Sequence, residues 1–158
     1  MNKYDKGIKL LEESCGNEKD NIISLATMAI DLSDDNKAYP NVREVDAYYE
    51  NGVFYITTWG KSNKILQIAN NKNVGFAVSM EGISGSGIGQ NLGWVLDPKN
   101  AQLRTKLRKV FSKWYDHANN EKDENCIILA IEITRVNIFR DEGAIQYNLD
   151  LVNQKEII

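Results

Sequence analysis

Residues 57–64, with the sequence Thr-Thr-Trp-Gly-Lys-Ser-Asn-Lys, carry the side chains best suited to binding an anion. The groups that could donate hydrogen bonds or charge belong to Thr57, Thr58, Lys61, Ser62 and Lys64. Hydroxyl and ammonium groups both donate to phosphate oxygens. If a helix begins at Ser62, its free backbone N–H groups and the positive end of its dipole add to the lysine charges. Spacing alone leaves two interpretations open, a phosphate site or a capped helix with two solvated lysines.

A hairpin and a helix are expected to position this segment. Residues 42–50 and 53–59 are rich in Val, Tyr, Phe, Ile and Thr. They flank Asn51-Gly52, a strong hairpin signal because both turn positions need a positive φ. The apolar spacing in residues 62–71 predicts a helix with Ser62 as its N-cap. The candidate site therefore lies where a strand passes into a helix.

The rest of the chain reads as short strands with a few helices. A helix is expected at the N-terminus, within residues 1–16, and a longer one over residues 97–118, where Asp97 is the cap and Pro98 the first helical residue. Residues 81–90, rich in Gly and Ser, are expected to be a mobile loop between two strands. The other expected strands cover residues 22–32, 73–80 and 91–96, a long stretch from residue 127, and residues 144–151.

These elements predict a mainly β protein with peripheral helices, in the α+β class. Six or seven strands at short spacing, without regular βαβ alternation, favour an antiparallel sheet closed into a barrel with two or three helices outside. A length of 158 residues fits one domain. Residues 1–158 are therefore expected to form a single unit, with the helix over 97–118 packed on the barrel.

Composition argues against several classes of protein. The net charge of −3 is unlike that of a globally basic nucleic-acid binder. The longest apolar stretch, residues 22–30, is interrupted by Ser24 and Thr27 and is too short to span a bilayer. Cys15 and Cys126 have no metal-like or redox-like spacing. We expect a cytoplasmic protein with no metal, no nucleic-acid partner and no membrane association.

Several short motifs follow one another in a specific order. Residues 40–45 read Pro-Asn-Val-Arg-Glu-Val, residues 54–58 read Phe-Tyr-Ile-Thr-Thr, residues 62–68 read Ser-Asn-Lys-Ile-Leu-Gln-Ile, and residues 70–74 read Asn-Asn-Lys-Asn-Val. This order resembles the pyridoxamine 5′-phosphate oxidase-like family of FMN-binding split barrels. The resemblance covers about residues 22–151 and is densest over residues 40–78. It implies an antiparallel split β-barrel of six to seven strands.

The resemblance also implies a cofactor and its site. Members of this family are homodimers that bind FMN in clefts at the subunit interface. Carried over residue by residue, the isoalloxazine edge would be lined by Arg43, Glu44 and Val45, and the ribityl chain and phosphate would lie near Thr57 and Thr58. The phosphate grip would consist of Ser62, Asn63 and Lys64. Asn63 stands where the family usually has arginine, and Lys61 could replace the missing charge.

The function implied is that of an FMN-dependent oxidoreductase acting on a small organic molecule, with NADH or NADPH as a candidate electron donor. The last arginine is Arg140 and the single histidine is His117, which does not match the Arg and His residues that hold the substrate in true pyridoxamine-phosphate oxidases. The sequence suggests no catalytic acid or base, and His117 is expected at the surface. A flavin- or nucleotide-binding sensor or storage protein without turnover is the alternative, and haem or a deazaflavin could replace FMN.

Two further patterns are open to more than one interpretation. The glycines of residues 81–90 lack the spacing and the βαβ context of a dinucleotide-binding site. As a loop, this segment could form a lid near the flavin or the dimer interface, where Gln90 or Asn91 would reach the partner's flavin. The helix over 97–118 carries six cations up to Lys113, which favours a solvated face over a nucleic-acid surface.

Overall fold

The structure is a computed structural model that describes residues 1–31 and 34–157. In chain order, the helices and strands are α1 (Lys3–Cys15), β1 (Asp20–Asp31), β2 (Lys37–Glu50), β3 (Val53–Trp59), α2 (Asn63–Asn70), β4 (Asn73–Val78), β5 (Ile83–Trp94), α3 (Ala101–Val110), α4 (Tyr115–Ala118), β6 (Cys126–Arg140), β7 (Ile145–Asp150) and β8 (Lys155–Glu156). Short 3₁₀ turns cover Pro98–Asn100 and Asp141–Gly143. Leu32, expected to end the first strand, lies outside the described residues.

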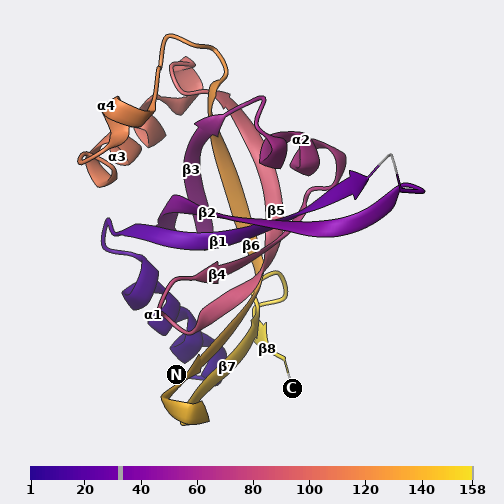
Figure 1. Cartoon of the computed structure of the whole chain (residues 1–158). Helices are drawn as coiled ribbons and strands as arrows, with labels where there is room; N and C mark the ends of the chain where they lie inside the picture. The colour runs from indigo at the N-terminus through magenta and orange to yellow at the C-terminus, as the bar shows by residue number, and fades with distance from the viewer. Residues whose placement is uncertain (32–33, 158) are drawn as a thin grey trace.

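The sheet is antiparallel and closes on itself (Figure 1). Its strand order is β3-β2-β1-β4-β5-β6-β7-β8, and an additional pairing joins β3 to β6. That pairing aligns Val53 with Glu132 and Trp59 with Cys126, so that six strands form a ring. β7 and β8 extend the sheet beyond the ring. The predicted α+β barrel is confirmed.

The expected hairpin forms as its turn residues require. Asn51 and Gly52 have φ values of +50° and +80°, the left-handed conformation that the Asn-Gly pair adopts readily. The turn aligns Glu50 with Val53 and Tyr48 with Tyr55. The turn thereby fixes the register of β3 against β2, and β3 leads into α2.

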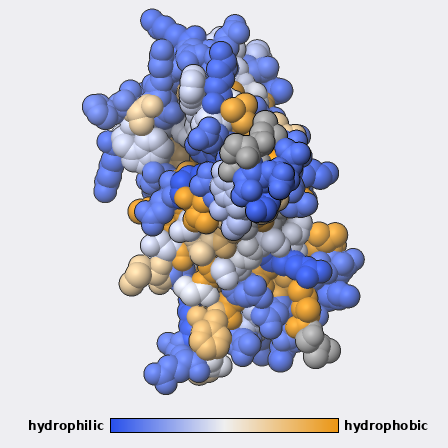
Figure 2. All heavy atoms as spheres, turned by 45° about the vertical axis from the view of Figure 1, so that its right-hand side comes forward, coloured by the Kyte–Doolittle hydropathy of each residue, from blue (hydrophilic) through white to orange (hydrophobic). Residues whose placement is uncertain are grey.

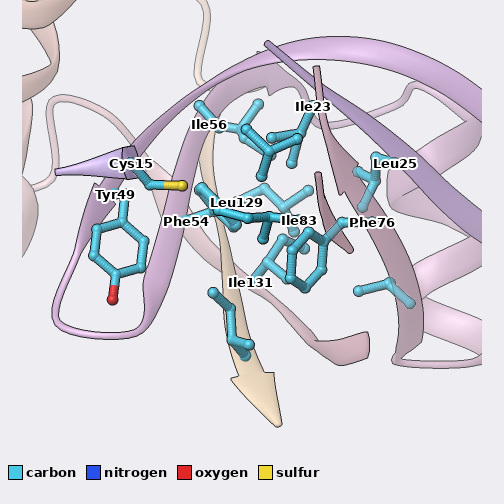
Figure 3. Close-up of a cluster of buried hydrophobic side chains, with 14 of the residues drawn as sticks. Cys15, Ile23, Leu25, Tyr49, Phe54, Ile56, Phe76, Ile83, Leu129 and Ile131 are labelled. Atoms are coloured by element: carbon cyan, nitrogen blue, oxygen red, sulfur yellow. The ribbon is translucent and has the colours of Figure 1, made fainter. Parts of the chain in front are cut away.

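Two hydrophobic clusters hold the barrel together. Alternate residues of the strands fill the interior, where Phe54 packs edge-on against Phe76 at a centroid distance of 5.3 Å (Figure 3). The second cluster lies on the outside, between α3–α4 and the outer faces of β2, β3 and β6. Its fully buried aromatic and aliphatic side chains include Phe111, Leu107 and Ile128.

Most of the segment expected to be a mobile loop, residues 83–90, is instead part of β5, and only residues 81–82 form a turn. Residues 83–94 pair with β4 on one side and with β6 on the other. A Cβ on Gly87 would stand 2.6 Å from the carbonyl oxygen of Glu132 on β6, and a Cβ on Gly89 would stand 2.8 Å from Ile68 on α2. Glycine is used here for close approach of neighbouring elements, and a pattern based on composition cannot distinguish that use from flexibility.

The helix expected over residues 97–118 is divided. Asp97 caps the first turn by accepting a hydrogen bond from the backbone N–H of Lys99, as predicted. The chain then forms α3 as far as Val110, passes through a turn and resumes as α4 at Tyr115. The longest helix in the described part of the chain is therefore α1, with 13 residues. Because the helix is interrupted, Phe111 and Tyr115 can both pack into the second hydrophobic cluster.

Candidate anion-binding site

The start of α2 has the geometry expected of an anion site. Ser62 occupies the N-cap position with extended backbone, at φ −68° and ψ 157°. The predicted N-cap position is confirmed, but the hydroxyl of Ser62 accepts no hydrogen bond from the first turn of the helix. The hydroxyl instead accepts a hydrogen bond from Lys64 Nζ at 3.4 Å. The first N–H groups of α2 are therefore not blocked by the side chain of Ser62, and they remain suited to an anion.

Arg43 reaches the same region from β2. Its Nη1 donates to Thr27 Oγ1 at 2.6 Å, and its Nη2 donates to Gln67 Oε1 at 3.1 Å. Nη1 also donates to the main-chain oxygens of Leu25 and Asn41. Thr27 in turn donates to Gln67 Oε1 at 2.5 Å, which links β1, β2 and α2 in one network.

The charge of Arg43 acts on Lys64 within the site. Burial lowers the pKa of Lys64, and the neighbouring charge of Arg43 lowers it further. Burial also lowers the pKa of Arg43. Among residues 1–31 and 34–157, no salt bridge joins either cation to a carboxylate. Two partly buried positive charges without a counter-charge form an environment that favours a bound anion.

A groove of about 530 Å³ adjoins this pair. It lies between α2 and the part of the β1–β2 ribbon that extends beyond β4. Gln67 belongs both to the groove wall and to the Arg43 network. The other residues that line the groove are Met28, Ala29, Ile30, Tyr39, Asn41, Asn63, Leu66 and Asn70. The groove is thus partly apolar, with the polar network at one side.

Not all of the expected site residues converge. Glu44 is exposed, and strand alternation directs it away from Arg43, whereas Val45 packs against the interior cluster. Alternation along β3 also separates the threonine pair. Thr58 shares the face of Phe54 and Ile56, while Thr57 shares the opposite one. Thr57 Oγ1 is buried and has no hydrogen-bond partner in the part of the chain described.

Sequence reasoning missed Thr27 and Gln67. Thr27 is a polar residue in an apolar run and is only 1% exposed, which is consistent with a role in a buried network. Gln67 follows Lys64 by three residues, so the two side chains share one side of α2. Helical spacing from Lys64 could have identified Gln67, whereas only the strand register reveals the approach of Thr27 to Arg43.

The basic side chains of α3 are offset by carboxylates. Arg104 forms a two-pronged pair with Glu121 at 2.8 and 2.7 Å, and Arg108 Nη2 lies 2.7 Å from Asp116. The Arg104 pair and the Tyr115 hydroxyl lower the pKa of Glu121 to about 2. Lys106 pairs with Glu50 and Lys109 with Glu18. This charge compensation leaves α3 less cationic than its sequence suggests.

Two features are absent from the part of the chain that the structure describes. Within residues 1–31 and 34–157, no three His, Cys, Asp or Glu side chains gather in a way that could hold a metal ion. In the same ranges, none of the helices has the length and apolar character needed to cross a membrane.

The fold places this chain in the split-barrel class, defined by a closed six-strand antiparallel barrel with added strands and peripheral helices. Solved structures with the same fold and low sequence identity support this assignment. General stress protein 26 from Bacillus anthracis str. Sterne is 18% identical and has a TM-score of 0.61, over 90% of this chain and 97% of that one. No protein-family model matches the sequence, and no curated protein matches it.

Two further solved structures extend the comparison. A protein from Clostridium acetobutylicum, related to general stress protein 26 of B. subtilis and described as of the pyridoxinephosphate oxidase family, is 14% identical with a TM-score of 0.58, over 96% of both chains. An FAD-binding protein from Mesorhizobium loti is 19% identical with a TM-score of 0.59, over 82% of this chain and 90% of that one. The resemblance noted in the sequence is confirmed at the level of fold.

Proposed function

We propose that this protein binds FMN and acts as an FMN-dependent oxidoreductase on a small organic substrate. The observation that carries the proposal is the pair of uncompensated cations, Arg43 and Lys64, beside Ser62 at the start of α2. Support also comes from the fold, because one of the similar solved structures is named as FAD-binding and another as of the pyridoxinephosphate oxidase family.

The residues present suit the phosphate end of such a cofactor. Lys64 and Arg43 supply charge, Ser62 supplies a hydroxyl, and the first N–H groups of α2 supply donors. Asn63 is exposed at the groove, where it adds an amide donor but no charge. Thr58, on the face of the barrel interior, and the main chain of Glu44 and Val45 are further candidates for contacts. When bound, a flavin supplies hydride and electron transfer, and the protein supplies binding and orientation.

We also propose that the working unit is a homodimer with the flavin at the interface. Apolar side chains reach the surface among polar ones (Figure 2). Near the candidate site, Tyr39 is 46% exposed, Val42 60% and Leu66 58%. A second copy of the chain would cover such surface. Light scattering is expected to give the mass of two chains, and the mass of one chain with FMN bound would contradict the dimer.

A visible absorption spectrum tests the cofactor. The protein is recorded as purified, then mixed with FMN and desalted. We expect a retained flavin spectrum at about one FMN per chain, the stoichiometry of two sites in a dimer. A colourless protein after this treatment would contradict FMN binding, and the same procedure with haem and with a deazaflavin would then identify the cofactor.

Turnover is tested separately. We expect NADH or NADPH to bleach the bound flavin under anaerobic conditions, and an added small organic acceptor to restore its colour. A protein that retains FMN but shows no bleaching with either donor would instead be a flavin-binding sensor or storage protein. A cytoplasmic location remains part of the proposal; both cysteines are free in the structure, as reduced thiols would be there.

A further inference from the structure

The guanidinium of Arg43 is oriented by neutral partners. A carboxylate partner would fix the geometry of an arginine and cancel its charge at the same time. Every acceptor of Arg43 in the described structure is a neutral oxygen. The oxygens belong to the side chains of Thr27 and Gln67 and to the main chain of Leu25 and Asn41. The charge is held in place without being neutralised.

Gln67 is central to this arrangement. Its Oε1 accepts from both Arg43 and Thr27, and its side chain also forms part of the groove wall. Because guanidinium nitrogens can only donate, the amide must present its oxygen to Arg43. A glutamate at this position would supply the same oxygen together with a negative charge next to the two cations. The choice of amide over carboxylate therefore sets the charge of the site.

We infer that Gln67 and Thr27 are positioning residues that orient Arg43 while leaving its charge available, so that the site selects a phosphate-bearing ligand over the neutral form of the same molecule. This inference rests on the proposed function for its ligand, FMN rather than riboflavin. It goes beyond that function in naming the residues that produce the selection. An unpaired, partly buried cation also costs stability, which a bound anion would restore.

The test uses Gln67→Glu in the full chain, with inorganic phosphate, FMN and riboflavin as probes. Without ligand, the variant is expected to melt at the same temperature as the parent protein or higher, because the new carboxylate pairs with Arg43. Inorganic phosphate is expected to raise the melting temperature of the parent protein, relative to chloride at equal ionic strength, and to lose this effect in the variant. FMN affinity is expected to fall at least about tenfold, and riboflavin affinity to change less than about threefold.

Gln146→Glu provides the matched control. Gln146 is exposed on β7, outside the six-strand ring and outside the groove, so the substitution makes the same chemical change away from the site. FMN affinity is expected to change less than about threefold, because an exposed charge is screened. A loss equal to that of Gln67→Glu would show a general electrostatic effect and would overturn the role of Gln67.

A second pair of variants covers the case in which Gln67→Glu does not fold. Thr27→Val preserves the shape of the side chain but removes the acceptor at 2.6 Å from Arg43. It is expected to reduce the ratio of FMN affinity to riboflavin affinity, and Thr27→Ser is expected to restore it. A purely structural role for Thr27 would instead change both affinities by the same factor.

The outcomes separate this inference from the proposed function. If Gln67→Glu keeps its response to phosphate and its FMN affinity within about threefold, the inference is wrong and FMN binding stands. If the parent protein fails to bind FMN but is stabilised by phosphate, and the variant is not, FMN binding is wrong and the inference stands. If the parent protein responds to neither probe, both are wrong.

Discussion

Arg43 on β2 and Lys64 on α2 are neighbouring cations, and the charge of Arg43 lowers the pKa of Lys64. The two residues are 21 positions apart in the sequence and belong to elements that do not follow one another directly. Folding brings together like charges that repel, and burial adds to the cost of keeping both ionised. A site with these properties is stabilised by an anion, and its behaviour can be tested at Lys64 itself.

Replacing Lys64 with methionine removes the charge and keeps most of the aliphatic side chain. We expect Lys64→Met to weaken FMN binding at least about tenfold, since a charge-assisted contact to phosphate contributes about 1.5–3 kcal/mol. Riboflavin binding should change little. Lys61→Met tests whether Lys61 replaces the missing arginine charge. Because Lys61 is exposed and its charge acts on Asp123, we expect a loss of FMN affinity of less than about threefold. Titration by flavin fluorescence measures the affinities of the parent protein and of both variants for FMN and for riboflavin. An unchanged FMN affinity in Lys64→Met would exclude Lys64 from the site.

The affinity for FMN should depend on alkaline pH. Because the pKa of Lys64 lies below that of an ordinary lysine, the ammonium loses its proton earlier as pH rises. We therefore expect the ratio of FMN affinity to riboflavin affinity to fall before the ordinary lysine pKa is reached. In Lys64→Arg the ratio should stay flat, since arginine remains charged throughout. Titrations between about pH 7 and 10 test this, in a range where the phosphate is a dianion. Equal slopes in both proteins would assign the titration to another group.

The stability of the protein should also depend on pH, because of Asp46 on β2, which pairs with Ile22 of β1. Burial and a hydrogen bond with Asp20 raise the pKa of Asp46 to about 6. Asp20 Oδ2 also accepts from Trp114 Nε1 at 2.9 Å. Between the ordinary pKa of 3.8 and about 6, the folded protein binds more protons than the unfolded chain, so stability falls as pH rises through this window.

Asp46→Asn should remove this loss of stability at higher pH. At pH 7 we expect its Tm to exceed that of the parent protein by about 2–4 °C, the shift that about 1 kcal/mol produces in a domain of this size. At pH 4 the two proteins should melt at similar temperatures. Glu44→Gln removes an exposed carboxylate from the same strand and should shift the Tm by no more than about 1 °C. A Tm difference for Asp46→Asn that does not vary with pH would contradict the raised pKa.

The effect of replacing a glycine of β4 or β5 should depend on how close the neighbouring atoms lie. A Cβ on Gly87 would stand 2.6 Å from the main-chain oxygen of Glu132, whereas a Cβ on Gly75 of β4 would meet Ala26 at 3.6 Å. We expect Gly87→Ala to lower the free energy of unfolding by about 1–3 kcal/mol. Gly75→Ala should change it by less than about 1 kcal/mol, because ordinary contacts are kept. Denaturant titration measures both, and equal effects would mean that β5 lies less close to β6.

The local sequence determined the elements that depend on neighbouring residues. The Asn51-Gly52 turn, the start of α2 at Ser62 and the Asp97 cap follow from backbone and side-chain preferences within a few residues. The barrel class also followed, because the spacing of strands and turns restricts how a sheet can close. The two-residue strand β8 was not predicted, since it is too short to show a pattern.

Local composition and spacing gave wrong predictions where the same residue pattern can have more than one physical cause. Glycine and serine in residues 81–90 indicated a mobile loop, yet Gly87 and Gly89 permit close approach of β5 to β6 and to α2. The helix over 97–118 looked continuous from its apolar spacing, yet it divides between Val110 and Tyr115. In both cases the deciding contacts come from elements distant in sequence.

Within the site, the sequence alone determined the types of side chain, including the lysine and serine at the start of α2 and the arginine on β2. Only the tertiary structure decided which of them act together. It joins Arg43 to Lys64, separates Thr57 from Thr58 by strand alternation, and adds Thr27 and Gln67. The reason is physical: whether a charge is paired, buried or opposed depends on the register of β1 with β2 and on the packing of α2 against them.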